Sequence, residues 1–387
     1  MSLLLACTLS ILPHAPAEAP REPAPRVRVV VLAGQSNMEG KGFPDPVAWQ
    51  VGQEAYRDRW TRIIEDGDHA EFTRVHAASL ERDPKRPEYR WSKRDDVLVR
   101  FLGKRGPLTV GYGVPDKAFG PELFLGQALG EHFDDPVLLI KAAWGGKTLA
   151  IDFRPPSAGL PSDEALAARR EQHNAGVQRH NEKNPDRPRP LMTEAEQRAA
   201  FGHFYRQMMD QVSGTLTNLD TQFPALAGHE PVMEGFVWFQ GWNDQFEEWG
   251  QQDYGRLLAC LGSDVRAAWS TADLPIVVGV VGFDGPRNQP LKNGEKTPRT
   301  LIQEGQRALP TLEAFEGSAA AVETAPFWDL EADAIFHGPG GWSADVARWQ
   351  QFGNDRPYHY LGSPWFFAQA GEAFGEALVR LSSARAR

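Results

Sequence analysis

The sequence predicts an α/β fold, a three-layer α/β/α sandwich built around a parallel sheet. Short apolar runs rich in β-branched residues are bounded by turn residues, and segments with helical spacing lie between them. Runs that are apolar on both faces suit parallel strands covered by helices on two sides. Alternation of such strands with helices indicates a parallel sheet between two helical layers. The expected strands are 27–33, 136–140, 235–239, 276–281 and 319–324, and the expected helices are 121–132, 193–219 and 254–269.

The C-terminal segment predicts one further helix. Ser363 and Pro364 suit the N-cap and the first helical position. An apolar residue then recurs at every fourth position from Phe366 to Leu378, which gives one apolar stripe. We therefore expect this helix to dock on the sheet, with His359 in the loop just before it.

Composition excludes several classes of partner. The chain has 387 residues, of which 41% are hydrophobic and 24% are charged, an ordinary globular balance. Its net charge is -10 and it has no long Lys/Arg run, so nucleic acid and anionic membranes are not expected partners. Beyond the N-terminus, no stretch approaches the ~20 apolar residues of a membrane span.

The N-terminus predicts export. Residues 1–19 resemble a signal peptide, residues 20–26 a Pro-rich linker, and residues 27–387 a single domain. A disordered leader and a lipoprotein signal ending at Cys7 are the alternatives, and export predicts a secreted or periplasmic protein. The polar stretches near 153–190 and 286–299 are predicted to be insertions. They either form the walls of a binding cleft or are surface loops without a binding role.

Three of the expected strands end at residues that suit acyl chemistry. Ser36 follows the first strand, the pair Gly145 and Gly146 follows the second, and Asn243 follows the third. Ligands of open α/β sheets bind at the carboxyl ends of the strands. A serine there becomes a nucleophile when a base is near, while a glycine N–H and an asparagine amide can donate to an oxyanion. Taken singly, each residue is equally explained by a helix cap or a turn.

A late Asp/His pair completes the set. Asp355 and His359 precede the C-terminal helix, and a histidine oriented by a carboxylate is the usual general base. Two other histidine pairs, 69/76 and 173/180, are each seven residues apart, lack the pattern of zinc ligands and read as surface residues.

The order Ser, Gly, Asn, Asp/His resembles the four blocks of the SGNH hydrolase superfamily. The stretches 34–38, 119–123, 141–149 and 358–363 are similar to its sialate O-acetylesterase and acetylxylan-esterase branch, carbohydrate esterase family six and relatives. The resemblance covers residues 27 to about 380 and implies a flavodoxin-like SGNH fold. Trp242 is a departure, because many relatives carry Glu there.

The resemblance implies roles for these residues. Ser36 would be the nucleophile and His359 the general base. The oxyanion hole would combine the Ser36 N–H, a Gly145 or Gly146 N–H and the Asn243 side chain. The superfamily usually places its acid three residues before the histidine, where this chain has Arg356. The orienting acid is therefore expected to be Asp355, four residues before the histidine; Asp329 is the alternative, or no acid is needed.

The expected function is hydrolysis of O-acyl, in particular O-acetyl, esters of carbohydrates, without metal or cofactor. The partner is an acetylated sugar or polysaccharide. Substrate contacts are expected from four residues beside the reacting groups: Gln35, Trp144, Gln240 and Trp242. The two tryptophans suit either sugar stacking or core packing. The alternatives are a lipase or thioesterase for longer acyl chains, an acyl transferase between sugars, and a non-catalytic carbohydrate-binding protein on the same fold.

Overall fold

The computed structural model describes residues 24–287 and 295–385. The expected signal peptide and most of the linker lie outside the described residues, as does the centre of the second insertion. The signal peptide and the single-domain boundaries therefore stay predictions.

A seven-stranded sheet forms the centre of the molecule, in the order β3-β2-β4-β1-β5-β6-β7. All neighbouring strands pair in parallel except β2 and β3. The strands are β1 (Arg26–Gly34), β2 (Arg94–Phe101), β3 (Lys104–Leu108), β4 (Val137–Ala143), β5 (Glu230–Phe239), β6 (Ile276–Val280) and β7 (Ala319–Glu323).

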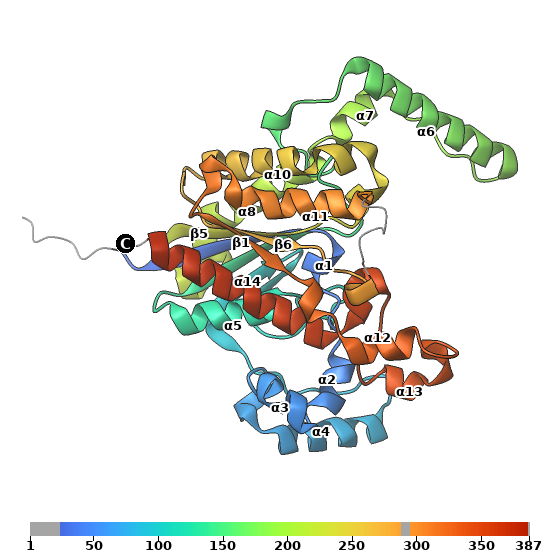
Figure 1. Cartoon of the computed structure of the whole chain (residues 1–387). Coiled ribbons are helices and arrows are strands. Elements are labelled where there is room, and N and C mark those ends of the chain that lie inside the picture. Colours follow the sequence, from blue (N-terminus) through green and yellow to red (C-terminus); the bar gives the residue numbers. More distant parts are fainter. Residues whose placement is uncertain (1–23, 288–294, 386–387) are drawn as a thin grey trace, which may run out of the picture.

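Helices cover both faces of the sheet, which confirms the predicted three-layer α/β/α architecture (Figure 1). One face carries α8 (His203–Thr217), α10 (Glu248–Ala268) and α11 (Pro298–Ala308), and the other carries α5 (Glu122–His132) and α14 (Pro364–Arg385). β1 lies between β4 and β5, and its residues 29–34 are all buried, as expected for a strand covered on both faces.

The expected helix over 193–219 is broken into α7 (Glu194–Ala200), α8 and α9 (Leu219–Gln222). Gly202 separates the first two, with a left-handed φ of 66°. Its N–H donates to the Ile151 carbonyl at 2.7 Å, and a Cβ here would lie 2.7 Å from the Arg154 carbonyl oxygen. The four-residue apolar spacing survives inside α8, so the pattern was correct and only its continuity was wrong.

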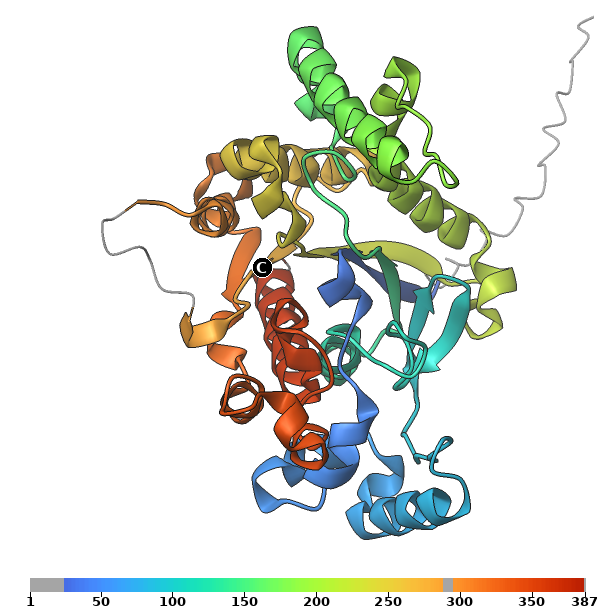
Figure 2. The same cartoon turned by 90° about the vertical axis from the view of Figure 1, so that its right-hand side faces the viewer.

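The first insertion contains a long helix rather than an irregular loop. α6 (Asp163–Lys183) begins after Ser162, whose side chain caps it by accepting from the Ala165 N–H. Together with α7 it projects beyond the sandwich, on the side of the sheet that carries α10 and α11 (Figure 2). On the other side lie the short helices α2 (Pro44–Gln50), α3 (Glu54–Thr61), α4 (His69–Arg82), α12 (Leu330–Phe336) and α13 (Val346–Trp349).

Within the described ranges, no helix is long and apolar enough to cross a membrane.

Candidate active site

The carboxyl ends of three adjacent strands, β4, β1 and β5, supply the groups of the candidate site. β1 ends at Gly34, where a Cβ would lie 2.2 Å from the Phe239 carbonyl oxygen. Glycine therefore lets the chain turn sharply against β5 at a φ of 152°, a value that other residues rarely adopt. Ser36 then opens the single-turn helix α1 (Ser36–Glu39) and is 7% exposed.

Ser36, His359 and Asp355 form one chain of hydrogen bonds, although the serine and the histidine are 323 positions apart. The Ser36 Oγ lies 3.0 Å from His359 Nε2, and His359 Nδ1 lies 2.9 Å from Asp355 Oδ2. An ionised carboxylate can only accept, so Nδ1 carries the proton and Nε2 presents its lone pair to the serine hydroxyl. This arrangement can deprotonate Ser36.

Asp355 is held in its ionised form. Burial raises the pKa of Asp355, but the hydrogen bond and charge of His359, with the Arg356 N–H and Lys41, outweigh burial and lower the pKa overall. Asp329 lies elsewhere in the structure. Its carboxylate accepts from the Ala332 N–H at 3.0 Å and from the Ser363 hydroxyl at 2.5 Å, so it caps α12 and holds the Ser363 side chain just before α14.

The loop that carries His359 is fixed by contacts that sequence reasoning missed. In the 3₁₀ segment η10 (Pro357–Gly362), Tyr360 and Leu361 have left-handed φ values of 51° and 62°. Tyr360 is fully buried, and its hydroxyl accepts from the Gly282 N–H at 3.0 Å. The Asn37 Nδ2 donates to the Tyr358 carbonyl at 3.0 Å and so ties α1 to this loop.

The Asn243 amide is oriented by Gln35. The Gln35 Nε2 donates to Asn243 Oδ1 at 3.0 Å, while Gln35 Oε1 accepts from the N–H groups of Gly241 and Asn243 at 3.2 and 3.3 Å. The Asn243 Nδ2 is left with no acceptor among the described residues and can donate to a ligand. Gln35, expected to contact substrate, instead uses its own amide to position this donor.

The two glycines after β4 differ in their hydrogen bonding. The Gly145 N–H already donates to Glu39 Oε1 at 2.8 Å, so it is not open to an oxyanion in this structure. Gly146 has a left-handed φ of 73°, and a Cβ at this position would meet no atom within 4 Å. Its N–H has no acceptor in the described part of the chain. Of the two expected donors, Gly146 is the available one.

Two of the residues expected to contact substrate have partners within the protein. Gln240 is 1% exposed, and its amide bonds the Lys147 carbonyl, Asp244 and the Tyr254 hydroxyl. The Trp144 ring packs against Phe153 and Phe204, at centroid distances of 5.9 and 5.1 Å.

Trp242 lies closer to the reacting groups. Its ring centroid is 5.3 Å from that of Tyr358, whose ring in turn lies 4.6 Å from the His359 imidazole. Tyr358 is 37% exposed, whereas Trp242 is half-buried and also packs on Phe283 at 4.5 Å, so the pair forms a partly accessible apolar surface beside the histidine.

Buried charges brace the loops behind the site. Asp244 accepts from the N–H groups of Leu149 and Ala150, both at 2.9 Å, and so links the loop after β5 to the loop after β4. Burial is the main cause that raises the pKa of Asp244 from 3.8 to about 6. At the end of β4, the fully buried Lys141 pairs with Glu122 at 2.7 Å, and burial lowers the pKa of Lys141.

The residues that the structure describes contain no group of three or more His, Cys, Asp and Glu side chains arranged to hold a metal ion.

Fold and site together define an α/β sandwich with a hydrogen-bonded Ser–His–Asp chain at the carboxyl edge of its sheet. No protein-family model and no curated protein matches the sequence. Among solved structures, the chain is similar to a protein from Arabidopsis thaliana, with 12% identity and a TM-score of 0.46, covering 92% of this chain and 98% of that one.

Two further solved structures are similar at comparable distance. A carbohydrate acetylesterase from Xanthomonas citri shares 15% identity at a TM-score of 0.42, covering 90% of this chain, which spans only 55% of that protein. NanS shares 13% identity at a TM-score of 0.38, covering 78% of this chain and 79% of its own.

Proposed function

We propose that the protein is a serine esterase that hydrolyses O-acyl esters of carbohydrates, acetyl esters above all. The observation that carries this proposal is the hydrogen-bond chain from Ser36 through His359 to Asp355, which lies at the sheet edge where α/β proteins bind ligands. The available donors of Ser36, Gly146 and Asn243 support it, because acyl transfer develops negative charge on the carbonyl oxygen.

The reaction follows from these positions. The Ser36 Oγ attacks the acyl carbon while His359 Nε2 takes its proton, and the oxyanion accepts from the three donors. The intermediate collapses, the bond to the sugar oxygen breaks, and that oxygen leaves with the proton from His359. A water molecule then attacks the acyl-Ser36 ester, gives a proton to His359, and releases the carboxylic acid as Ser36 regains its hydroxyl hydrogen.

Two observations support a carbohydrate ester as the substrate. The motif at residues 34–38 resembles that of carbohydrate esterases. The partly accessible rings of Trp242 and Tyr358 lie beside the histidine, and aromatic rings present an apolar face on which a pyranose can stack.

Acetate release from a panel of acetylated glycans tests the proposal. We expect Ser36→Ala and His359→Ala each to lower kcat by about 10³ or more, by analogy with triad deletions. His337→Ala is a matched control, because His337 also pairs with an aspartate four residues away, Asp333 at 3.0 Å, but does not bond Ser36. Its rate should stay within about threefold of wild type.

Other outcomes would replace the proposal. Peak activity on p-nitrophenyl octanoate rather than acetate would indicate a lipase or thioesterase. Glycan binding that persists without any acetate release, in wild type and Ser36→Ala alike, would indicate a carbohydrate-binding protein. Transfer of the acetyl group to an added sugar in preference to water would indicate a transferase.

A further inference from the structure

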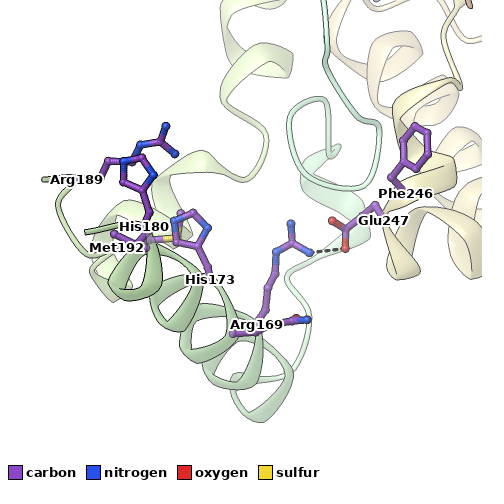
Figure 3. A pocket seen from close by; sticks show the side chains of 10 residues that line it. Arg169, His173, His180, Arg189, Met192, Phe246 and Glu247 are labelled. Carbon is purple, nitrogen blue, oxygen red and sulfur yellow. Dashed lines mark hydrogen bonds and ion pairs between the residues drawn. The ribbon is translucent and has the colours of Figure 1, made fainter. Parts of the chain in front are cut away.

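A cavity of about 480 Å³ lies between the inserted helix α6 and the turn that follows Asn243 (Figure 3). Arg169, His173 and His180 line it from one face of α6, because spacings of four and seven residues bring side chains to the same side of a helix. Phe246 and Glu247 lie across from them. His173 and His180, which have no role in the ester chemistry, thus lie together on one wall of this cavity.

Two asparagines of α6 hold the irregular segment that follows the helix, which also contributes to this wall of the cavity. Asn174 bonds both the N–H and the carbonyl of Met192, at 2.8 and 2.9 Å, and Asn181 bonds those of Arg189 at 2.7 and 2.8 Å. Each asparagine side chain therefore bonds one residue of the segment through both its N–H and its carbonyl, as a neighbouring β-strand would. The returning segment is fixed against the helix, with Arg189 at the cavity.

The charge of the cavity differs from that of the chain. The chain carries a net charge of -10, yet among the lining residues two arginines face a single carboxylate, Glu247, and two histidines add hydrogen-bonding nitrogens. Arg169 pairs with Glu247 at 2.5 Å, whereas Arg189 forms no ion pair within the described part of the chain. Guanidinium groups bind planar carboxylates through two parallel hydrogen bonds, so Arg189 suits an anionic ligand.

A row of aromatic rings connects this cavity to the candidate active site. The centroid distances are 4.6 Å from His359 to Tyr358, 5.3 Å from Tyr358 to Trp242, and 5.7 Å from Trp242 to Phe246. Phe246 is 70% exposed, which is unusual for so large an apolar ring. The row is longer than one pyranose ring, so a ligand that spans it is an oligosaccharide or a polymer.

We infer that the cavity between α6 and the Phe246–Glu247 turn binds carboxylate-bearing sugar units of an acidic polysaccharide whose acylated unit lies at Ser36. This inference rests on the proposed esterase function and assigns its substrate class: a polymeric uronate-containing glycan rather than a free monosaccharide. Sugar rings pass over Trp242 and Phe246, a carboxylate pairs with Arg189, and the imidazoles of His173 and His180 bond neighbouring oxygens.

Competing substrates test the inference. Chemically acetylated polygalacturonate and chemically acetylated neutral xylan, matched in acetyl content, are compared by the ratio of their kcat/KM values. We expect wild type to prefer the acidic polymer, and Arg189→Glu to reduce that ratio at least about tenfold because a carboxylate would then face a carboxylate. Phe246→Ala should raise KM for both polymers. The acidic preference should also fall between about 0.02 M and about 0.5 M salt.

Arg86→Glu is the matched control. It makes the same charge reversal, but Arg86 is exposed and follows α4, on the opposite side of the molecule from α6 (Figure 1), so the ratio should not change. Melting temperatures of the variants check that each is folded. Equal ratios in wild type, Arg189→Glu and Arg86→Glu would overturn the inference.

A direct binding measurement separates this inference from the esterase proposal. Calorimetric titration of Ser36→Ala with unacetylated polygalacturonate should show binding that Arg189→Glu, added to the same variant, abolishes. Binding of this kind, together with a wild type that releases no acetate from any acetylated glycan, would sustain the glycan site and end the esterase proposal. Acetate release by wild type, with no binding of polygalacturonate to Ser36→Ala, would end the glycan site and sustain the esterase.

Discussion

Asp355 and Asp329 differ in what their carboxylates contact. Asp355 accepts from His359, whereas Asp329 accepts from the Ala332 N–H and the Ser363 hydroxyl. Asp355→Asn should lower kcat by about 10²–10⁴, because an amide there no longer stabilises the imidazolium and favours the wrong tautomer. Asp329→Asn should leave kcat within about threefold and lower the melting temperature, because it weakens a helix cap. Steady-state kinetics and thermal melts of the two variants measure this.

A kcat for Asp355→Asn within threefold of wild type would mean that another group orients His359. The sequence favoured Asp355 as the orienting acid but left Asp329, or no acid, as alternatives, since the choice depends on contacts between loops far apart in the chain. The same holds for Gln35. Its position beside Ser36 indicated a substrate contact, and only the fold shows that its amide is used to orient Asn243.

At the scale of elements, the His359 loop depends on Tyr360. Tyr360→Phe removes the acceptor of the buried Gly282 N–H and leaves that group without a partner. We expect a loss of about 1–3 kcal/mol in the free energy of unfolding, measured by urea titration, with a severalfold fall in kcat as the loop loosens.

Tyr358→Phe is the control for this loss. The Tyr358 side chain is 37% exposed and its hydroxyl has no hydrogen bond among the described residues, so the unfolding free energy should change by less than about 0.5 kcal/mol. Equal losses in the two variants would show that the Tyr360 hydroxyl does not brace the loop.

Elements with a strong local pattern were predictable, and elements that depend on tertiary contacts were not. The apolar runs of β1, β4, β5 and β6 and the stripe of α14 were read directly from the sequence. β2 was missed because it opens with three charged residues and only its centre is apolar. α4 was missed although Asp68, whose side chain accepts from the N–H groups of Ala70 and Glu71, is a readable cap signal.

At the scale of the whole molecule, Asp244 makes stability depend on pH. Its folded-state pKa of about 6 exceeds the ordinary 3.8, so its contribution is fully present below about pH 4 and is lost as pH rises through 6. The difference corresponds to about 3 kcal/mol. The melting temperature of wild type minus that of Asp244→Asn should therefore shrink between about pH 4 and about pH 7.

All other titrating groups are the same in the two proteins, so their effect cancels when one melting temperature is subtracted from the other. The Asn variant keeps one acceptor oxygen and so loses one of the two hydrogen bonds from Leu149 and Ala150, but this offset does not vary with pH. A melting-temperature difference that stays constant over this range would show that Asp244 is ionised in the folded protein throughout it.

The strand order has one consequence for how such a chain can change. Every proposed reacting group except the late Asp/His loop is anchored on the inner strands β4, β1 and β5, while β3 and β7 are the outermost strands. Changes in the outer strands and in the inserted helices should therefore leave the positions of these groups unaltered. If the proposed esterase activity holds, a different helical arm in place of residues 156–200 should change which polymer is cleaved, while turnover of a small acetate ester persists.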